Sequence, residues 1–349
     1  MRIVQVVRRF GPVGGMEEYV WCLTKSLTAI LSEPVQVLCE SNDSEPIAGT
    51  NLEMIPPTSV GPRWYRLWRF SNYVNQWRNE QSLQDTIIHS HEFSCGAEVL
   101  TFHTTVHGAG EQFGVKCLDP SWHLNQWRER TVLHSPQLCK IVPVSALLSR
   151  QLKKYHPRCE DKLAEPIPPG VKLAHFEKSS AHQPTIGFIG REWNRKGMRQ
   201  VVDIFREMLL KNKDTKLVLA GMPKAEIGEV ISGLEDQVEI MGWIDNKSDF
   251  YDRIQLLIHP ARLEAFGMVV TEAMTRGIPV LVSDQVGAAS EVTSEFGKVM
   301  PLQAPLEDWV RATKELLSAS SSVGSAYSRT WERVADEYAV LYEKISSSR

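Results

Sequence analysis

The chain has 349 residues, which is enough for two α/β domains that each bury a hydrophobic core. Its content of 42% hydrophobic and 23% charged residues excludes a disordered or fibrous protein. The formal net charge of −3 gives no general attraction to nucleic acid, so we expect no nucleic-acid partner.

The six cysteines are scattered without a C-x-x-C pair, and the sequence contains no D-x-D pair. We therefore expect neither a zinc site nor a divalent metal held on phosphates, and no cofactor. The apolar run near the N-terminus is short for a signal peptide, and no stretch approaches the roughly 20 apolar residues of a membrane span. The prediction is a cytoplasmic protein, with peripheral attachment to the cytoplasmic face of the membrane as an alternative.

Short β-branched runs alternate with longer amphipathic segments, which is typical of βαβ units on parallel sheets. The predicted strands are Arg2–Val7, Val35–Cys39, Thr86–Ser90, Glu98–Phe102, Lys140–Val144, Thr185–Ile189, Lys216–Ala220, Val238–Ile240, Gln255–His259 and Ile278–Ser283. A proline-rich break at Pro166–Gly170 separates the two halves. We predict two Rossmann-like domains, residues 1–175 and 176–325, and a C-terminal segment, 326–349, with a helix at Arg329–Ile345. Because parallel sheets bind ligands beyond the carboxyl ends of their strands, chemistry is expected in a cleft between the domains.

The first predicted strand runs into a loop that carries Gly14 and Gly15 and opens a helix. Glycines there would let a phosphate or an acceptor approach the backbone closely. The segment is not G-x-G-x-x-G, which disfavours a dinucleotide cofactor. A plain turn remains the alternative interpretation.

A basic and aromatic segment, Arg63–Phe70, places Arg63, Arg66 and Arg69 beside tryptophans one helical turn apart. An amphipathic helix of this kind can lie at a membrane interface or bind an anionic glycolipid. It can equally be a docking helix that packs by its aromatic face. Both interpretations stay open.

His103 follows the strand Glu98–Phe102 in the segment that runs on to Gly108, where it could bond a sugar hydroxyl or serve the core. His89 and His91 could be mistaken for metal ligands. The alternation of a strand puts Glu92 on the opposite face from them, so we expect no metal there.

The strand Thr185–Ile189 runs into a loop with Arg191, Arg195 and Lys196. A departing diphosphate develops negative charge that needs a metal or fixed cations. Arg191 and Lys196 are the candidates, since Arg grips two phosphate oxygens and Lys acts as a point charge. We expect Arg195 to be solvated.

The strongest motif is His259–Ala273, a strand followed by a loop with Glu264 and a helix that begins near Phe266 or Gly267. The helix start leaves the amides of Phe266, Gly267 and Met268 unpaired, which with the helix dipole favours a phosphate. Carboxylates beside phosphates should serve neutral hydroxyls, so we assign Glu264 to the transferred sugar and Glu272 to a ribose. The alternative is an ordinary helix start.

Together these segments resemble glycosyltransferase family 4, the retaining GT-B enzymes, and especially those that build bacterial envelope glycoconjugates such as the lipopolysaccharide core. The matching pieces are Gly14–Glu17, Phe102–Thr104, Val142–Ser145, Ile167–Val171, Gly190-Arg191 with Lys196-Gly197, and Glu264–Glu272. Pro169 and Ala288 depart from the family pattern, which commonly has Asn and Gly there.

The resemblance implies that Arg191 and Lys196 bind the diphosphate and that His103 contacts the donor sugar. It implies a metal-independent hexosyl-type transferase with a nucleotide-diphosphate sugar, UDP favoured, and a glycan or glycolipid acceptor. It also implies that the last helix crosses back to the first domain. No residue stands out as a nucleophile, so we hypothesise front-face transfer in which the leaving diphosphate takes the acceptor proton. The alternatives are a nucleotide-sugar epimerase and a non-catalytic nucleotide-sugar-binding subunit.

Overall fold

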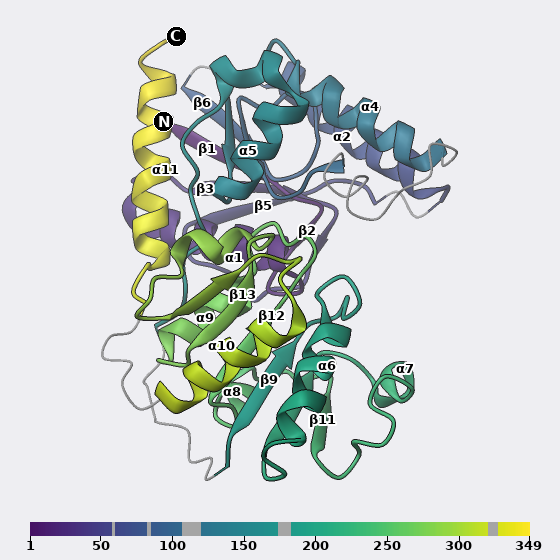
Figure 1. Cartoon of the computed structure of the whole chain (residues 1–349). Coiled ribbons are helices and arrows are strands. Elements are labelled where there is room, and N and C mark those ends of the chain that lie inside the picture. Colours follow the sequence, from purple (N-terminus) through teal and green to yellow (C-terminus); the bar gives the residue numbers. More distant parts are fainter. Residues whose placement is uncertain (58–59, 82–84, 107–119, 174–182, 320–326) are drawn as a thin grey trace. The chain divides into compact units, whose positions relative to one another are not determined.

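The computed structural model of the chain describes residues 1–57, 60–81, 85–106, 120–173, 183–319 and 327–349. It divides into two compact units, which are described separately (Figure 1). Unit 1 comprises Met1–Gly170 and Arg329–Arg349, and unit 2 comprises Val171–Ser328. The predicted boundaries after residues 175 and 325 lie outside the described residues, as do His107 and Gly108.

Unit 1 is built on a parallel six-stranded sheet in the order β5-β3-β1-β6-β7-β8. The order reverses direction between β1 and β6, which makes this pair the topological switch point of a doubly wound sheet. The strands are β1 (Arg2–Val6), β3 (Val35–Cys39), β5 (Thr50–Met54), β6 (Thr86–Ser90), β7 (Val99–Phe102) and β8 (Lys140–Pro143). A separate short pair joins β2 (Arg9–Phe10) to β4 (Ser41–Asn42).

The helices of unit 1 are α1 (Gly15–Ile30), α2 (Arg63–Glu80), α4 (Pro120–Leu133), α5 (Ala146–Tyr155), the 3-10 helix η1 (Pro157–Lys162) and α11 (Trp331–Ser346). The helix α2 buries Phe70, Val74 and Trp77, which recur at helical spacing, in one core with the sheet residues Val4 and Ile88. Its exposed side faces away from that core, and α4 packs beside it.

The last helix, α11, belongs to unit 1 although the whole of unit 2 precedes it in sequence. It packs along α1, and the ring of Trp331 meets the ring of Tyr19 edge-on, with centroids 5.1 Å apart (Figure 1). Gly170 allows the close approach of the chain, because a Cβ there would lie 2.6 Å from the amide nitrogen of Trp331. The hydroxyl of Thr330 caps the helix by accepting from the amide of Arg333.

Unit 2 repeats the architecture on a second parallel six-stranded sheet, in the order β11-β10-β9-β12-β13-β14. Its switch point lies between β9 and β12. The strands are β9 (Thr185–Ile189), β10 (Lys216–Ala220), β11 (Val238–Gly242), β12 (Leu256–His259), β13 (Val280–Ser283) and β14 (Gly297–Met300). The helices are α6 (Met198–Leu209), α7 (Lys224–Ile227), α8 (Ser248–Tyr251), α9 (Met268–Thr275), the 3-10 helix η2 (Gly287–Glu291) and α10 (Leu306–Ala319).

One core of unit 2 lies where α6 and α10 cover the sheet. Phe188 and Ile258 of the central strands are fully buried there with Phe205 of α6 and Trp309 of α10. Strands covered on both faces need apolar residues at consecutive positions rather than at alternate ones. That requirement fits β9 and β12, which are buried at every position and mostly apolar, and it made both predictable.

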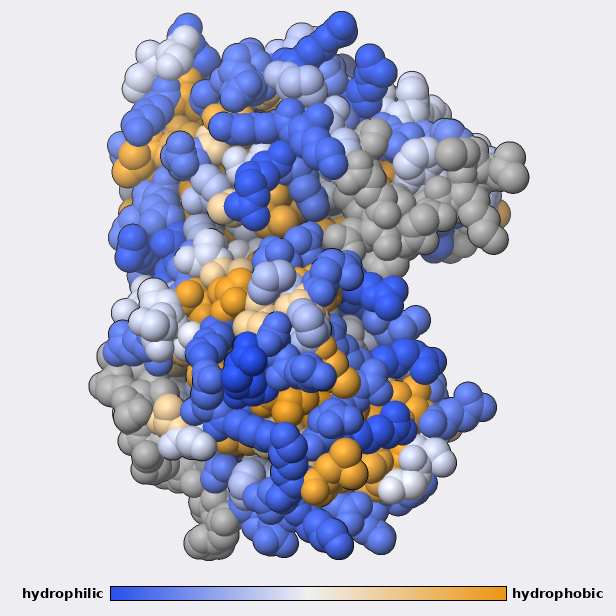
Figure 2. Space-filling view, viewed as in Figure 1, coloured by the Kyte–Doolittle hydropathy of each residue, from blue (hydrophilic) through white to orange (hydrophobic). Residues whose placement is uncertain are grey.

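Hydrophilic side chains predominate on the face of the molecule in Figure 2, and apolar side chains gather there in separate areas. Among the described helices, none is long and apolar enough to cross a membrane.

Candidate functional site

In unit 2, the loops that follow β9 and β12 bring Lys196 and Glu264 together. These strands are neighbours at the switch point, so the loops leave the sheet side by side. The ammonium of Lys196 lies 3.2 Å from Oε2 of Glu264. Gly197 makes this approach possible, since its φ of 86° suits glycine and a Cβ would lie 2.2 Å from the carbonyl oxygen of Pro260.

Arg195 joins the same group, so the expectation that it is solvated was wrong. Its Nη1 lies 3.3 Å from Oε2 of Glu264 and also donates to the carbonyl oxygen of Leu263. Its Nη2 also donates to Glu192 of its own loop, so the guanidinium is bonded to both loops. The sequence could not show this, because the bond joins residues 68 positions apart.

Two cations therefore face one carboxylate. Burial alone would raise the pKa of Glu264, but the charges of Lys196 and Arg195 hold that pKa well below its usual range. Glu264 is consequently ionised throughout the neutral range, and it can accept hydrogen bonds from hydroxyl groups.

His259 ends β12 directly behind this group and was not predicted as a site residue. Its side chain is fully buried, burial lowers its pKa, and its Nε2 lies 3.9 Å from Oε2 of Glu264. Neither ring nitrogen has a hydrogen-bond partner among the described residues. Buried polar groups are normally paired, so the His259 imidazole is an exception within the described part of unit 2.

The helix α9 begins beside Glu264, with Gly267 as its N-cap at a φ of 91°. The loop before it is bonded to the start of η2, as the amide of Gly287 donates to the carbonyl oxygen of Glu264 at 2.9 Å. In the described part of the chain, no oxygen accepts from the amides of Phe266, Gly267 and Met268. That these amides and the positive end of the helix dipole bind an anion stays a prediction.

The structure does not bring Glu272 or Arg191 into contact with Glu264. One carboxylate oxygen of Glu272 pairs with Lys247 and the other accepts from Tyr251, each at 2.7 Å. Arg191 is exposed, and its guanidinium lies 5.1 Å from the ring centre of Trp243. Trp243, 58% exposed at the end of β11, is a residue that sequence reasoning missed.

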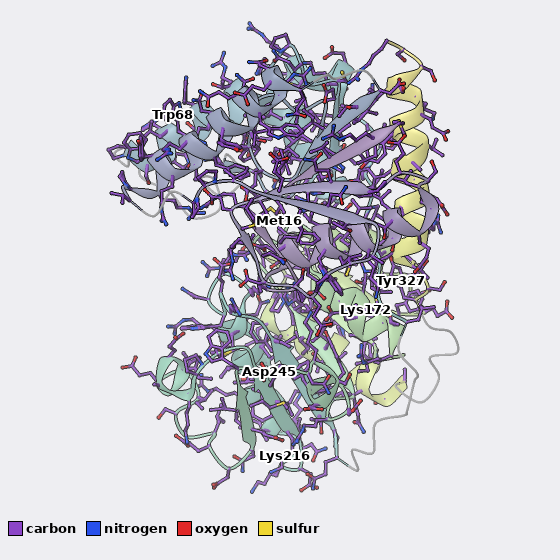
Figure 3. All side chains as sticks on the ribbon, turned by 180° about the vertical axis from the view of Figure 1, so that it is seen from behind. Met16, Trp68, Lys172, Lys216, Asp245 and Tyr327 are labelled. Carbon is purple, nitrogen blue, oxygen red and sulfur yellow. The ribbon has the colours of Figure 1, made fainter. Side chains whose placement is uncertain are left out.

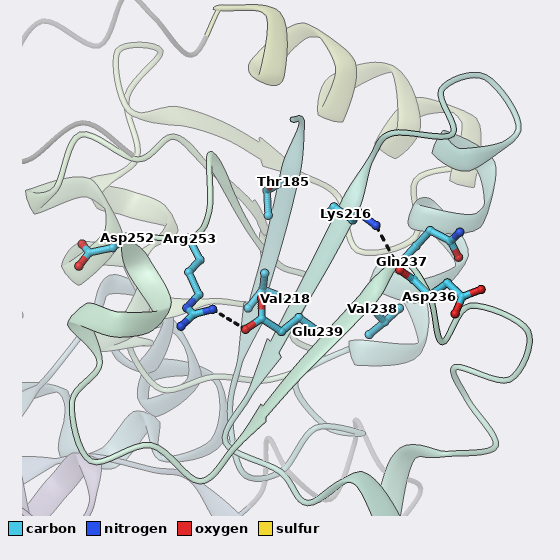
Figure 4. Close-up of a pocket in the computed structure, with 9 residues that line it drawn as sticks. All are labelled: Thr185, Lys216, Val218, Asp236, Gln237, Val238, Glu239, Asp252 and Arg253. Atoms are coloured by element: carbon cyan, nitrogen blue, oxygen red, sulfur yellow. Dashed lines mark hydrogen bonds and ion pairs between the residues drawn. The ribbon is translucent and has the colours of Figure 1, made fainter. Parts of the chain in front are cut away.

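A different hollow in unit 2, of about 580 Å³, lies towards the amino ends of the strands (Figure 4). It is lined by Thr185, Lys216 and Val238, and its charged residues are partly bonded to one another. Arg253 pairs with Glu239 at 2.6 Å. The hollow contains none of the predicted site residues, and the carboxyl ends of the strands are where parallel sheets bind ligands.

In unit 1, Gly14 is the N-cap of α1 and Gly15 its first residue, just before Met16, which is labelled in Figure 3. A Cβ on Gly15 would have no neighbour within 4 Å, whereas one on Gly14 would lie 2.4 Å from the carboxylate of Glu17. The surface at Gly15 is therefore open, as the prediction of close approach requires.

His103 follows β7 and is partly exposed, and its ring belongs to a buried network. Its Nε2 lies 3.0 Å from Nδ1 of His91, whose Nε2 lies 2.7 Å from the side-chain carbonyl oxygen of Gln5. Burial lowers the pKa of His103 to about 3 and that of His91 well below its usual value, so both rings are neutral at pH 7.

The directions of these bonds follow from Gln5. A carbonyl oxygen only accepts, so the hydrogen of His91 is on Nε2 and its Nδ1 accepts from Nε2–H of His103. Nδ1 of His103 is then left as a lone-pair acceptor. That nitrogen has no partner among the described residues, and it suits a hydroxyl donor.

The network continues to α11. The amide of Gln5 donates to the hydroxyl of Tyr342 at 3.2 Å, and that hydroxyl lies 2.6 Å from Nδ1 of His89. Nε2 of His89 lies 2.7 Å from the hydroxyl of Thr101, which lies 2.6 Å from that of Tyr338. Each ring nitrogen of His89 and His91 thus has a protein partner in unit 1.

The predicted arginines lie on α2, where Arg63 and Arg69 are exposed and Arg66 is partly buried. Trp64 and Trp68 are 45% and 44% exposed, so the described part of the chain does not cover them. The helix packs against the sheet through its other face and leaves these two tryptophans at the surface.

Residues 183–319 match the family described as glycosyl transferases group 1. The lipopolysaccharide core biosynthesis mannosyltransferase LpsB of Rhizobium meliloti is 32% identical over 31% of this chain and 33% of its own length. The corresponding mannosyltransferase LpcC of Rhizobium leguminosarum bv. viciae is 30% identical over 38% of this chain and 43% of its own. The matches thus span less than half of these relatives.

Two solved structures share the fold over almost the whole chain. WaaG, a glycosyltransferase involved in lipopolysaccharide biosynthesis, has a TM-score of 0.77 at 18% identity, covering 99% of this chain and 98% of WaaG. Sucrose-phosphate synthase of Thermosynechococcus elongatus has a TM-score of 0.79 at 18% identity, covering 100% of both chains. The chain therefore has the GT-B fold, matches the group 1 glycosyl transferases over residues 183–319, and resembles the glycosyltransferases that build the lipopolysaccharide core.

Proposed function

We propose that this protein is a retaining, metal-independent glycosyltransferase. It moves a hexosyl group from a nucleotide-diphosphate sugar, UDP favoured, to a hydroxyl of a glycan or glycolipid in envelope polysaccharide synthesis. The observation that carries the proposal is the pairing of Lys196 with Glu264 beside the unpaired amides that open α9. The mannosyltransferase relatives and the neighbour HepE of Anabaena, solved with UDP and glucose, are consistent with it.

In the proposed mechanism, the bond between the sugar and the diphosphate breaks as the acceptor oxygen bonds to the same carbon on the same face. The acceptor proton passes to the leaving diphosphate, so no side chain acts as nucleophile or base. Lys196 and Arg191 stabilise the developing phosphate charge, together with the amides of Phe266 to Met268.

The remaining roles concern hydroxyl groups. Glu264 holds one hydroxyl of the transferred sugar, and His103 accepts a hydrogen bond from another. Gly14 and Gly15 leave room for the donor. Glu272 binds the ribose, for which its bonds to Lys247 and Tyr251 fix the carboxylate in place. In this proposal fixed cations replace a divalent metal on the diphosphate.

The first experiment is calorimetry with UDP, GDP, ADP and NAD, with and without EDTA. We expect one nucleoside diphosphate to bind the wild type equally well in both buffers, and Arg191→Ala/Lys196→Ala to lose that binding. A folded wild type that binds none of them would overturn the proposal. Binding of NAD alone would favour a dehydrogenase.

Product analysis separates the remaining rivals. The wild type should release diphosphate from one sugar donor of a panel comprising UDP-glucose, UDP-galactose, UDP-N-acetylglucosamine and GDP-mannose. Conversion of a donor into its epimer without release would identify an epimerase. Tight binding with neither reaction, in the presence of an acceptor, would indicate a non-catalytic subunit.

For the acceptor, we propose that Arg63, Arg66 and Arg69 face an anionic glycolipid, with peripheral membrane contact at the cytoplasmic face as the alternative. Arg66→Glu/Arg69→Glu should lower transfer to the acceptor about tenfold or more and leave donor hydrolysis unchanged. The control is Arg150→Glu/Lys153→Glu, a reversal of equal charge on α5 that should change neither rate.

Melting temperatures show whether each of these variants is folded, and flotation with anionic phospholipid vesicles tests the membrane alternative. Equal loss of transfer and hydrolysis in the folded α2 variant would contradict the assignment of these arginines to the acceptor.

A further inference from the structure

Unit 1 contains a cavity between α2 and α4 that the donor chemistry above does not use. Its volume is about 230 Å³, and the residues that line it include Trp68, Ser71, Asn72, Asn75, Trp127 and Arg128. Trp68 is labelled on α2 in Figure 3. The combination of aromatic rings, side-chain amides and one guanidinium distinguishes this cavity from a gap left by imperfect packing.

The two tryptophan side chains that line the cavity are exposed to solvent. Trp127 is 57% exposed and Trp68 is 44% exposed. Trp68 stacks on Tyr65, with ring centroids 6.0 Å apart and planes inclined by 23°, which limits its rotation. Large rigid rings beside a cavity offer apolar contact at a low cost in side-chain entropy, and the apolar face of a sugar ring fits such a surface.

The polar groups of the cavity are largely unused. Neither Asn72 nor Asn75 forms a side-chain hydrogen bond within the described residues. Ser71, by contrast, already accepts from the amide of Cys95 at 2.9 Å. Each free amide offers two donors and one carbonyl oxygen, which is the mixture that neighbouring hydroxyl groups of a sugar need.

Arg128 supplies the charge. Its Nη2 donates to the carbonyl oxygen of Phe93 at 3.2 Å, which uses one of the five N–H donors of the guanidinium. Burial lowers its pKa; Glu92 opposes this shift, while Arg63 and Arg8 reinforce it. Such a guanidinium retains donors for a carboxylate or a phosphate.

Among the described groups that act on Arg128, two are arginines and one is a carboxylate. Arg8 is neutralised by Glu40, whose Oε2 lies 2.6 Å from its Nε. Glu92 is the carboxylate that faces Arg128, and burial raises its pKa to about 7, so it is only partly ionised at neutral pH. Arg63 adds a further exposed positive charge from the start of α2.

We propose that this cavity binds a negatively charged sugar ring, namely a uronic acid or a sugar phosphate. Trp68 and Trp127 contact the apolar face of the ring, Asn72 and Asn75 bond its hydroxyls, and Arg128 binds its carboxylate or phosphate. The identification of this ring as part of the acceptor rests on the proposed glycosyltransferase function. The binding chemistry itself rests only on unit 1.

The test uses the full chain labelled with ¹⁵N, without any donor. The indole N–H signals of Trp68 and Trp127 are assigned with Trp68→Phe and Trp127→Phe, and then followed during titration with four probes. The probes are glucuronic acid, glucose 6-phosphate, glucose and inorganic phosphate. Trp64→Phe is the matched control, since Trp64 is an equally exposed tryptophan of α2 that does not line the cavity.

We expect glucuronic acid or glucose 6-phosphate to shift both indole signals at concentrations at least tenfold below those needed with glucose. Arg128→Gln should remove this preference, and Trp64→Phe should leave it unchanged. The acid that binds more tightly identifies the anionic group. The proposal is overturned if no sugar shifts either signal, or if inorganic phosphate alone reproduces the shifts.

Calorimetry with UDP on the same sample distinguishes failure of the cavity proposal from failure of the transferase proposal. If UDP binds but no sugar shifts the signals, the cavity proposal fails and the transferase proposal stands. If the sugars bind but no nucleoside diphosphate does, the cavity proposal stands and the donor assignment fails.

Discussion

Lys196→Ala should weaken the binding of the nucleoside diphosphate about tenfold or more, whereas Glu264→Gln should leave that binding unchanged or tighter. Both variants should slow donor hydrolysis, Lys196→Ala by about 10²–10³-fold. The two residues form one ion pair of 3.2 Å, so a purely structural pair would give the two variants effects of the same sign. Calorimetry and the rate of diphosphate release from the donor measure the two quantities.

The reason lies in the charges around Glu264. With Lys196 and Arg195 both directed at this carboxylate, the free protein keeps its cations partly neutralised. Removal of the negative charge in Glu264→Gln frees Lys196 for the diphosphate and removes a repulsion. Loss of Lys196 removes a charge-assisted hydrogen bond, worth about 1.5–3 kcal/mol, from the complex.

The control is Lys298→Ala, because Lys298 and Glu315 form another lysine–glutamate pair of unit 2 whose side chains are 43% and 49% exposed. An exposed pair contributes little, so neither binding nor hydrolysis should change. If Glu264→Gln loses diphosphate binding as fully as Lys196→Ala while remaining folded, the pair is structural and the assigned roles are wrong.

Much of the fold could be predicted because both sheets are buried on both faces. Central strands such as β1 and β9 are buried at nearly every position and rich in β-branched residues, and the predicted bounds agree with them within one residue. The edge strands β5 and β14 were missed. Their sequences, Thr50–Met54 and Gly297–Met300, contain exposed polar residues, since an edge strand is covered less completely.

Residues of the candidate site could be predicted where they follow a strand within one motif. They could not be predicted where contacts join segments that are distant in sequence. Glu264 and Gly267 could be placed because the strand, the loop and the helix are contiguous in sequence. The bonds of Arg195 could not, and neither could the stacking of Arg191 on Trp243, which comes from another strand. The sequence showed His91 only as one of two histidines on a strand and could not predict its hydrogen bonds. Its partners Gln5 and His103 become neighbours only in the folded sheet.

Gln5→Leu and His91→Phe should each lower the rate of donor hydrolysis about 10- to 100-fold without changing the affinity for the nucleoside diphosphate. Neither Gln5 nor His91 reaches Nδ1 of His103. They are positioning residues, because their hydrogen bonds determine which ring nitrogen of His103 carries the hydrogen. With the carbonyl oxygen of Gln5 removed, nothing fixes the hydrogen of His91 on Nε2. Nδ1 of His103 then no longer stays free to accept from the sugar. The expected loss corresponds to one misplaced hydrogen bond of about 1.5–3 kcal/mol.

Tyr342→Phe is the matched control. It removes a buried hydroxyl that also bonds Gln5, and it should lower stability, but it leaves the Gln5 carbonyl oxygen on His91. Hydrolysis should therefore change less than threefold in this variant, measured below its melting temperature.

The ¹⁵N shifts of the His103 ring provide a readout that a loss of packing would not reproduce. In the wild type and in Tyr342→Phe they should report a hydrogen on Nε2, and in Gln5→Leu a mixture of tautomers. Because the pKa of His103 is lowered to about 3, this ring stays neutral down to pH 5, and its protonation adds no step to the rate profile above that pH. If the wild-type ring carries its hydrogen on Nδ1 instead, the direction of the whole network is reversed. His103 would then donate to the sugar, and Gln5 could not set its tautomer.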